Sequence, residues 1–254
     1  MECFGMPVFK EYTREELKQI KIEAPEEQMR KKVQQNWDQV AKPLDGMGWF
    51  ETLTAQIGAV LGTAALDLSK KAVLIFCADN GIVEEGVSQS GQEVTTAVVQ
   101  AMGKNESSVG KMSKKAGAVT IPVDIGMAVD TKVSKELKVA YGTANMTKGP
   151  AMTRAQAVQA LEAGIEMVRR LKEEGYGLLA TGEMGIGNTT TSSAVASVLL
   201  DRSVEEMTGR GAGLSGDGLN RKINAIRKAI EVNQPDPKDA IGAPSPTIFF
   251  KVCP

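Results

Sequence analysis

Three short apolar runs, each closed by an acidic residue and a glycine, constrain the fold of this chain more than any other feature. They are KAVLIFCAD at 71–79, GAVTIPVDIG at 117–126 and GLLATGEMG at 177–185. Runs of this length that lead into turn residues are typical of buried strands. Helical patterns separate the three runs, so the sequence predicts βαβ units and a parallel α/β sheet flanked by helices.

The helical patterns between the strands cover residues 94–102, 106–115 and 153–175. In the longest, Thr153 and Gln156 have the spacing of a capping box, and Gly175 is the expected stop. The spacing of three and four predicts a buried apolar stripe made of Val158, Leu161, Ile165, Val168 and Leu171.

The N-terminal part of the chain is predicted to be helical and to form a region of its own, residues 1–62, ahead of an α/β domain at 63–241. One helix carries an apolar stripe and is expected to end at Pro43, and a second helix follows it. The two stripes are Met29, Val33, Trp37 and Val40, then Phe50, Leu53, Ile57 and Val60.

Composition excludes several classes of function. The 30 basic and 31 acidic side chains nearly cancel, which gives no electrostatic reason to expect nucleic acid or an anionic membrane as a partner. Histidine is absent, which removes Ser-His-Asp chemistry and imidazole metal sites. The cysteines, Cys3, Cys77 and Cys253, are scattered, and we find neither a signal peptide nor a long apolar span, so a cytoplasmic protein is expected.

The carboxyl edge of the predicted sheet is the candidate site, because ligands of parallel sheets bind outside the carboxyl ends of the strands. Each predicted strand ends there in an acid and a glycine. The pairs are Asp79 and Gly81, Asp124 and Gly126, and Glu183 and Gly185. The alternative is that such residues simply follow many strands, and for the Asp124 loop the two interpretations are evenly balanced.

The stretch TGEMGIGNTTTSS at 181–193 leads from the third strand toward an apolar helix expected at 194–200. Glycines let the main chain approach a ligand closely, and N–H groups at a helix start favour anions. The hydroxyls at 189–192 can add hydrogen bonds. The stretch is neither a Walker A loop nor a dinucleotide fingerprint. It therefore indicates phosphate binding of a less common kind, or else a tight structural turn.

Glu183 is unusual in such a loop, because a carboxylate repels phosphate. It suits a ribose hydroxyl, a nitrogen heterocycle or a developing cation, such as the oxocarbenium-like carbon of a glycosyl transfer. A surface glutamate after a strand is the alternative.

A second glycine-rich loop, MTGRGAGLSGDGLNRK at 207–222, precedes a helix for which Asp217 is the expected N-cap. Arg210 and Lys222 could both serve a phosphate, or could belong to a solvated charged loop. The predicted apolar face of this helix consists of Leu219, Ile223, Ile226 and Ile230.

Seven stretches together resemble one enzyme family in their order along the chain. They are KPLDGMGWFETL, CADNGIVEEGVS, VDIGM, GTANMTKGPAM, TGEMGIGNTTTSSA, GRGAGL and NQPDPKD. The chain resembles the nicotinate-nucleotide–dimethylbenzimidazole phosphoribosyltransferases, which build the lower ligand of cobalamin, from about Lys42 to Ile241.

The resemblance implies a Rossmann-like parallel sheet, a homodimer, and no metal or organic cofactor. It also implies a reaction in which nicotinate mononucleotide gives its phosphoribosyl group to 5,6-dimethylbenzimidazole or a related base. The products are nicotinate and α-ribazole 5′-phosphate, formed with inversion at the anomeric carbon.

The resemblance also assigns residues. It implies that Glu183 faces the ribose and the reacting centre, and that Ser90 lines the pocket for the base, with Met184 and Ile186 as its apolar walls. The residues expected to hold the 5′-phosphate are Gly185, Ile186, Gly187, Asn188, Thr189, Thr190, Gly211 and Lys222.

Departures from the family pattern qualify these expectations. Asn80 stands where the family has histidine, and Thr191 where proline is common. Residues 242–254 match nothing in the family, and the glutamate that acts as general base in the family has no counterpart here. These two differences at the C-terminal end predict a frameshifted or truncated gene product. A genuinely shortened form of the enzyme is the less favoured alternative. The alternative function is a catalytically inactive relative that only binds nucleotide.

Overall fold

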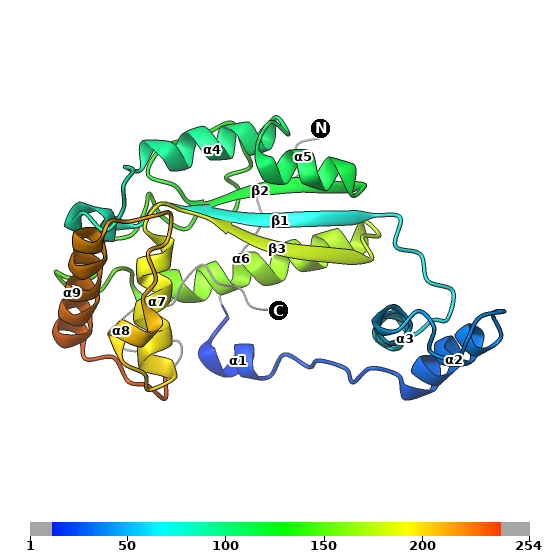
Figure 1. The fold of residues 1–254 in the computed structure, drawn as a ribbon. Coiled ribbons are helices and arrows are strands. Elements are labelled where there is room, and N and C mark those ends of the chain that lie inside the picture. The colour runs from blue at the N-terminus through cyan, green and yellow to red at the C-terminus, as the bar shows by residue number, and fades with distance from the viewer. Residues whose placement is uncertain (1–11, 240–254) are drawn as a thin grey trace.

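The computed structural model describes residues 12–239, so the predictions for residues 242–254, Cys3 and Cys253 lie outside the described part. In these residues a three-stranded parallel sheet has the order β2-β1-β3 (Figure 1). Its strands are β1 (Lys71–Ala78), β2 (Ala118–Gly126) and β3 (Leu178–Met184). All three predicted strands are confirmed, and the fold is α/β.

The pairing register of the strands places the carboxyl ends of β1, β2 and β3 side by side. Cys77 is opposite Asp124 on one side and Met184 on the other. β1 is central and buried on both faces, because its alternate side chains enter two cores. Leu74 and Phe76 pack toward α6 (Arg154–Glu173), whereas Ile75 and Cys77 pack toward α4 (Glu93–Gly103).

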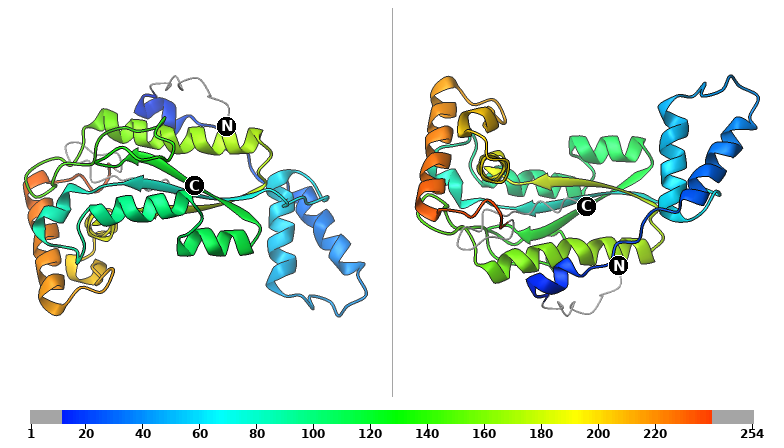
Figure 2. Two further views of the ribbon diagram at one scale, coloured as in Figure 1. Left: turned by 90° about the horizontal axis from the view of Figure 1, so that it is seen from above. Right: turned by 90° about the horizontal axis from the view of Figure 1, so that it is seen from below.

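Helices cover both faces of the sheet. α6 lies on one face, and α4 and α5 (Ser108–Lys115) lie on the other (Figure 2). The capping box of α6 is confirmed: the Thr153 hydroxyl accepts from the Gln156 N–H (3.2 Å), and the Gln156 side chain accepts from the Thr153 N–H (2.8 Å).

The predicted apolar stripe of α6 is wrong in most positions. Of its five members only Leu171 is buried, and Val168 is 42% exposed. The buried face instead contains Ala157, Ala160, Ala163 and Gly164. Small side chains let the helix lie close to the sheet, which turns the larger apolar residues to its flanks.

The N-terminal helices are α1 (Arg14–Lys18), α2 (Glu27–Asp38) and α3 (Trp49–Leu61). α2 and α3 pack on each other beyond the amino ends of the strands (Figures 1 and 2). The prediction that α2 runs to Pro43 is wrong: it ends at Asp38, and Lys42 in the connecting turn forms an ion pair with the buried Glu51 (2.8 Å).

The remaining elements gather at the carboxyl end of the sheet (Figure 1). They are the 3-10 helix η1 (Gly81–Glu85), α7 (Asn188–Leu199), α8 (Val204–Met207) and α9 (Gly216–Asn233). A separate core joins Ile82 and Val87 to Ala194 of α7 and Ile226 of α9. No helix within residues 12–239 is long and apolar enough to cross a membrane.

Two predicted helix starts are wrong. α7 begins at Asn188, six residues before the expected 194, so the threonines and serines form its first turns. α9 is capped by Ser215, whose hydroxyl accepts from the Gly218 N–H (3.1 Å), and Asp217 lies in its first turn. In both cases the polar residues that suggested a loop are themselves compatible with the start of a helix.

Candidate functional site

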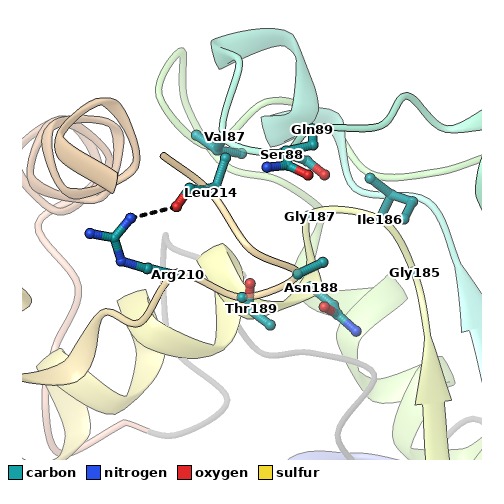
Figure 3. Close-up of a pocket in the computed structure, with 12 residues that line it drawn as sticks. Val87, Ser88, Gln89, Gly185, Ile186, Gly187, Asn188, Thr189, Arg210 and Leu214 are labelled. Carbon is teal, nitrogen blue, oxygen red and sulfur yellow. Dashed lines mark hydrogen bonds between the residues drawn. The ribbon is translucent and has the colours of Figure 1, made fainter. Parts of the chain in front are cut away.

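A pocket of about 420 Å³, open to solvent, lies where the first turn of α7 meets two loops. Its lining comes from three segments: Val87, Ser88 and Gln89; Gly185 to Thr189; and Arg210, Gly211, Ala212 and Leu214 (Figure 3). The sequence predicted the middle segment and Gly211, and it left Arg210 open. It assigned no role to the segment 87–89, although Val87 and Ser88 end the family-like stretch CADNGIVEEGVS and Gln89 adjoins the predicted Ser90.

The glycines let the main chain turn tightly beside β1. A Cβ on Gly185 would lie 2.2 Å from the carbonyl oxygen of Ala78, so only glycine fits there. Gly187 has a φ of 91°, which side chains other than glycine rarely adopt, and it precedes α7 directly. No side chain caps the start of α7. The start of α7, with the positive end of its helix dipole, therefore lies at the pocket.

Lys222 supplies a positive charge behind this helix start. Its side chain is fully buried, and its ammonium donates to the Thr189 hydroxyl (2.7 Å) and to the Gly209 carbonyl (3.0 Å). Burial lowers the pKa of Lys222. Among the described residues no carboxylate pairs with it. A buried ammonium without a counter-ion is unfavourable unless an anion arrives, so its position beside the pocket favours an anionic ligand.

Two further contacts order the second glycine loop: one ties it to the segment 87–89, and the other lies within the loop. Gln89 donates to the Gly213 carbonyl (2.5 Å), and Arg210 donates to the Leu214 carbonyl (2.7 Å). Figure 3 shows the Arg210 guanidinium directed toward Leu214. Gly211 is needed at this junction, because a Cβ there would lie 2.8 Å from the Thr189 hydroxyl and 3.4 Å from the Lys222 ammonium.

The predicted hydroxyl donors contribute less than expected. Of the four hydroxyls, only that of Thr189 belongs to a residue that lines the pocket. Thr190 is fully buried, and no described group bonds its hydroxyl. Thr191 is buried and donates to the Asn188 carbonyl (2.8 Å), a contact inside α7. The early start of α7 explains the difference, since successive helical residues point in different directions.

Glu183 lies next to the pocket and does not line it. Its carboxylate accepts a hydrogen bond from the side-chain amide of Asn188, which ties the end of β3 to the first residue of α7. Burial raises the pKa of the Cys77 thiol to about 12, and the negative charge of Glu183 adds to this effect. The hydrogen bond to Asn188 and the effect on Cys77 both place the Glu183 carboxylate on the sheet side of the start of α7.

Ser90 and Met184 also lie outside the pocket lining. Ser90 follows the segment 87–89 and is half-buried, with its N–H donating to the Ser88 hydroxyl (3.3 Å). Met184 is half-buried against the core that contains Cys77 and Val99. Ile186 does line the pocket.

The other two acids at the sheet edge have structural contacts. Asp124 accepts from the N–H groups of Gly126 (3.1 Å) and Met127 (2.9 Å) and pairs with Lys138 (3.2 Å). Asp79 accepts from the Ala128 N–H (2.8 Å), and burial raises its pKa. Both brace the loop after β2, which favours the structural interpretation for the Asp124 loop. Within residues 12–239 no group of acids and cysteines is arranged to hold a metal ion.

Known proteins are similar to this chain in sequence and in fold. A phosphoribosyltransferase family model matches residues 22–244. The nicotinate-nucleotide–dimethylbenzimidazole phosphoribosyltransferase of Acetivibrio thermocellus is 45% identical over 222 residues, which are 87% of this chain and 63% of the relative. That of Clostridium tetani is 43% identical over 223 residues, 87% of this chain and 62% of the relative.

Solved structures agree with the sequence relatives. CobT from Thermus thermophilus matches with a TM-score of 0.74 and 36% identity, over 80% of this chain and 62% of that one. The chain thus spans a little over three fifths of the length of the proteins it matches. It belongs to the phosphoribosyltransferase family that these proteins represent.

Proposed function

We propose that the pocket binds the 5′-phosphate of nicotinate mononucleotide. The observation that carries this proposal is the buried Lys222 ammonium, which has no carboxylate partner among the described residues and is bonded to Thr189 on the uncapped first turn of α7. A phosphate dianion would meet the helix dipole and a nearby cation together. The pocket is open to solvent, so the rest of a nucleotide can extend beyond the phosphate position.

Each predicted phosphate residue then has a specific role. The N–H groups of Gly187 and Thr189 are the proposed donors, since no described residue accepts from them. Gly185 and Gly211 allow the close approach of two loops. Lys222 supplies a positive charge next to Thr189, to which it is hydrogen-bonded. The side-chain amide of Asn188 holds the Glu183 carboxylate. Thr190 belongs to the first turn of α7 and helps to form the helix start. The N–H of Ile186 is already bonded to Thr95, so the proposed role of Ile186 is to line the pocket.

We place the ribose and the base on the side of Glu183. Its carboxylate lies at the end of β3 beside Asn188, within reach of a ligand whose phosphate occupies the helix start. A negative charge there would stabilise the oxocarbenium-like anomeric carbon as nicotinate leaves. Ser90 and Met184, which adjoin the pocket segments at 87–89 and 185–189, are the proposed wall for the aromatic base.

The proposed reaction is phosphoribosyl transfer for the lower ligand of cobalamin. A ring nitrogen of 5,6-dimethylbenzimidazole forms a bond to the anomeric carbon, the bond to nicotinate breaks, and the other ring nitrogen loses its proton. The 43–45% identity to enzymes with this name supports the assignment. From the family resemblance we also propose a homodimer in the cytoplasm. The solvent-exposed apolar side chains of α3 support the dimer, and the free, buried Cys77 is compatible with a reducing compartment.

The test is calorimetric titration with nicotinate mononucleotide, followed by chromatography for α-ribazole 5′-phosphate after dimethylbenzimidazole is added. Lys222→Met is expected to weaken nucleotide binding about 10- to 100-fold, the loss of a hydrogen bond to a charged group. Lys228→Met, on the exposed side of the same helix, is the matched control and should bind as the wild type does.

Three outcomes are informative. Equal affinities for nicotinate mononucleotide and for nicotinate riboside, which lacks the phosphate, would contradict a phosphate site. Binding followed by product that disappears in Glu183→Gln would support the transferase. Binding without product would support the alternative of a relative that only binds nucleotide.

A further inference from the structure

Two buried side chains hold the Ile186 peptide at the centre of the glycine loop. The Ile186 N–H donates to the Thr95 hydroxyl (3.1 Å), and the Ile186 carbonyl accepts from the Asn80 side-chain amide (3.2 Å). Thr95 is fully buried on α4, and Asn80, 5% exposed, directly follows the loop residue Asp79 after β1. Neither side chain lines the pocket. The loop is therefore held from both sides by groups that do not reach its ligand.

Asn80 also connects this peptide to neighbouring elements. Its side-chain oxygen accepts a long hydrogen bond from Thr191 of α7 (3.5 Å), and its main-chain carbonyl accepts from Gln92 just before α4 (3.2 Å). Its Cβ packs close to Gly187, because a Cβ added there would lie 3.3 Å away from it. Asn80 thus links the end of β1, the glycine loop and the first turn of α7.

These contacts determine which N–H groups of the loop remain for a ligand. Those of Asn188 and Thr190 donate within the turn, to the carbonyls of Gly185 (3.1 Å) and Gly187 (3.0 Å). With Ile186 bonded to Thr95, the N–H groups of Gly187 and Thr189 are left without an acceptor among the described residues. The Gly187 N–H shares one planar peptide group with the Ile186 carbonyl, so the hydrogen bond from Asn80 fixes its direction, and the bond to Thr95 fixes the preceding peptide group. The chain then turns directly into Thr189, whose N–H depends on this arrangement.

We propose that Thr95 and Asn80 are positioning residues for phosphate: by fixing the Ile186 peptide they hold the Gly187 and Thr189 N–H groups in a binding orientation. This inference rests on the proposed function, because it assumes that a phosphate occupies the helix start. Preorganised donors bind better than donors that must be ordered by the ligand, so loss of either contact weakens phosphate binding without removing any ligand contact.

The experiment compares Thr95→Val, which keeps the shape and removes the hydroxyl, with Thr95→Ser, which keeps the hydroxyl. Thr120→Val is the matched control, because Thr120 is a buried threonine on β2 whose hydroxyl bonds no described group. Each variant is titrated with nicotinate mononucleotide and with nicotinate riboside. Thr95→Val should lose about 3- to 10-fold in affinity for the nucleotide alone, because the Ile186 N–H loses its acceptor; the substitution also removes the hydrogen bond between Thr95 and Asp79. Thr95→Ser should restore it.

A second measurement does not depend on the ligand. Amide hydrogen exchange at Ile186 should be slow in the wild type and in Thr120→Val, and faster in Thr95→Val and in Asn80→Ala, which acts from the opposite side. If Thr95→Val does not fold, Asn80→Ala carries the same test.

The outcomes separate the two proposals. A wild-type chain that binds no nicotinate mononucleotide overturns the proposed function and this inference together. A wild-type chain that binds it, with Thr95→Val and Asn80→Ala unchanged in affinity, overturns the positioning role alone. Equal losses for nucleotide and riboside also overturn it, since they indicate a general structural defect.

Discussion

At the amino end of the sheet, α2 and α3 leave large apolar side chains in solvent, whereas at the carboxyl end α7 and α9 bury polar ones. Trp49 is 80% exposed and Val60 is 70% exposed, while Lys222 and Thr190 are fully buried. An apolar stripe was predicted at both ends, for α2 and α3 at one and for α9 at the other. The comparison shows that a helical stripe indicates which residues share a face, and that only the neighbouring elements decide whether that face is covered.

The two ends also differ in what their buried polar groups do. Glu51, buried between α2 and α3, is paired with Lys42 and accepts from the Met47 N–H (2.9 Å), so its charge is satisfied inside the protein. Lys222 has hydrogen bonds and no carboxylate partner in the described residues. A satisfied pair stabilises a turn, whereas an uncompensated buried charge is the basis of the anion site proposed at Lys222.

The largest effect is expected for Gly185→Ala at the carboxyl end. The new Cβ would lie 2.2 Å from the Ala78 carbonyl oxygen, so β1 or the loop must move, and we expect a loss of about 3 kcal/mol in the free energy of unfolding. Urea unfolding measures this. Gly209→Ala is the control, because nothing lies within 4 Å of its added Cβ. Comparable stability of the two variants would show that the loop is not tightly packed.

A smaller effect is expected for Gly58→Ala at the amino end. Its Cβ would lie 2.5 Å from a methyl group of Val33, so α2 and α3 must separate, and we expect a loss of about 1–3 kcal/mol. Trp37, whose indole N–H donates to Thr54 of α3 (2.8 Å), reports on this pair by fluorescence. Nucleotide affinity should not change, because the pair lies at the other end of the sheet.

Combining Gly58→Ala with Val33→Ala sharpens the second test. Removing the Val33 methyl groups makes room for the methyl group introduced at position 58, so part of the loss should be recovered. Strictly additive losses would mean that the two positions do not compete for the same space.

The smallest effect is the pH dependence of Lys222→Met. At neutral pH the variant is expected to be as stable as the wild type, or about 1 kcal/mol more stable, because it buries no charge. The folded pKa of Lys222 lies below its usual value of 10.5, so between the two pKa values the unfolded chain binds more protons. The stability of the wild type should therefore rise relative to the variant as pH approaches 10.5.

Urea unfolding at several pH values between about 7 and 10 measures this difference, with Lys228→Met correcting for the loss of one positive charge. A difference that stays constant across this range would show that the native and unfolded chains hold this proton equally well.

Several elements were predictable because they depend on local sequence. The three strands were found with boundaries that differ by one residue at most, since β1 and its neighbours are short apolar runs followed by turn residues. α4 and the capping box of α6 were also found, because Thr153 and Gln156 interact within one turn.

The candidate site was predictable only in part. The glycine loop was found because its residues are consecutive and unusual. The opposite wall, Val87 to Gln89, was missed because its residues have no distinctive chemistry and join the site through a contact between Gln89 and Gly213. Asn80 was noted only as a departure from the family pattern and Thr95 was missed, because their partner is distant in the sequence: Asn80 is separated from Ile186 by 106 positions and Thr95 by 91.

The sequence by itself determined the α/β class and the family, and it predicted the carboxyl edge of the sheet as the candidate site, because periodicity, turn residues and ordered motifs are properties of consecutive residues. Only the tertiary structure decided that Lys222 is buried behind Thr189, that α6 packs through alanines, and that the Ile186 peptide is held by two distant side chains. These depend on which surfaces meet, and burial and long-range hydrogen bonds exist only once the chain has folded.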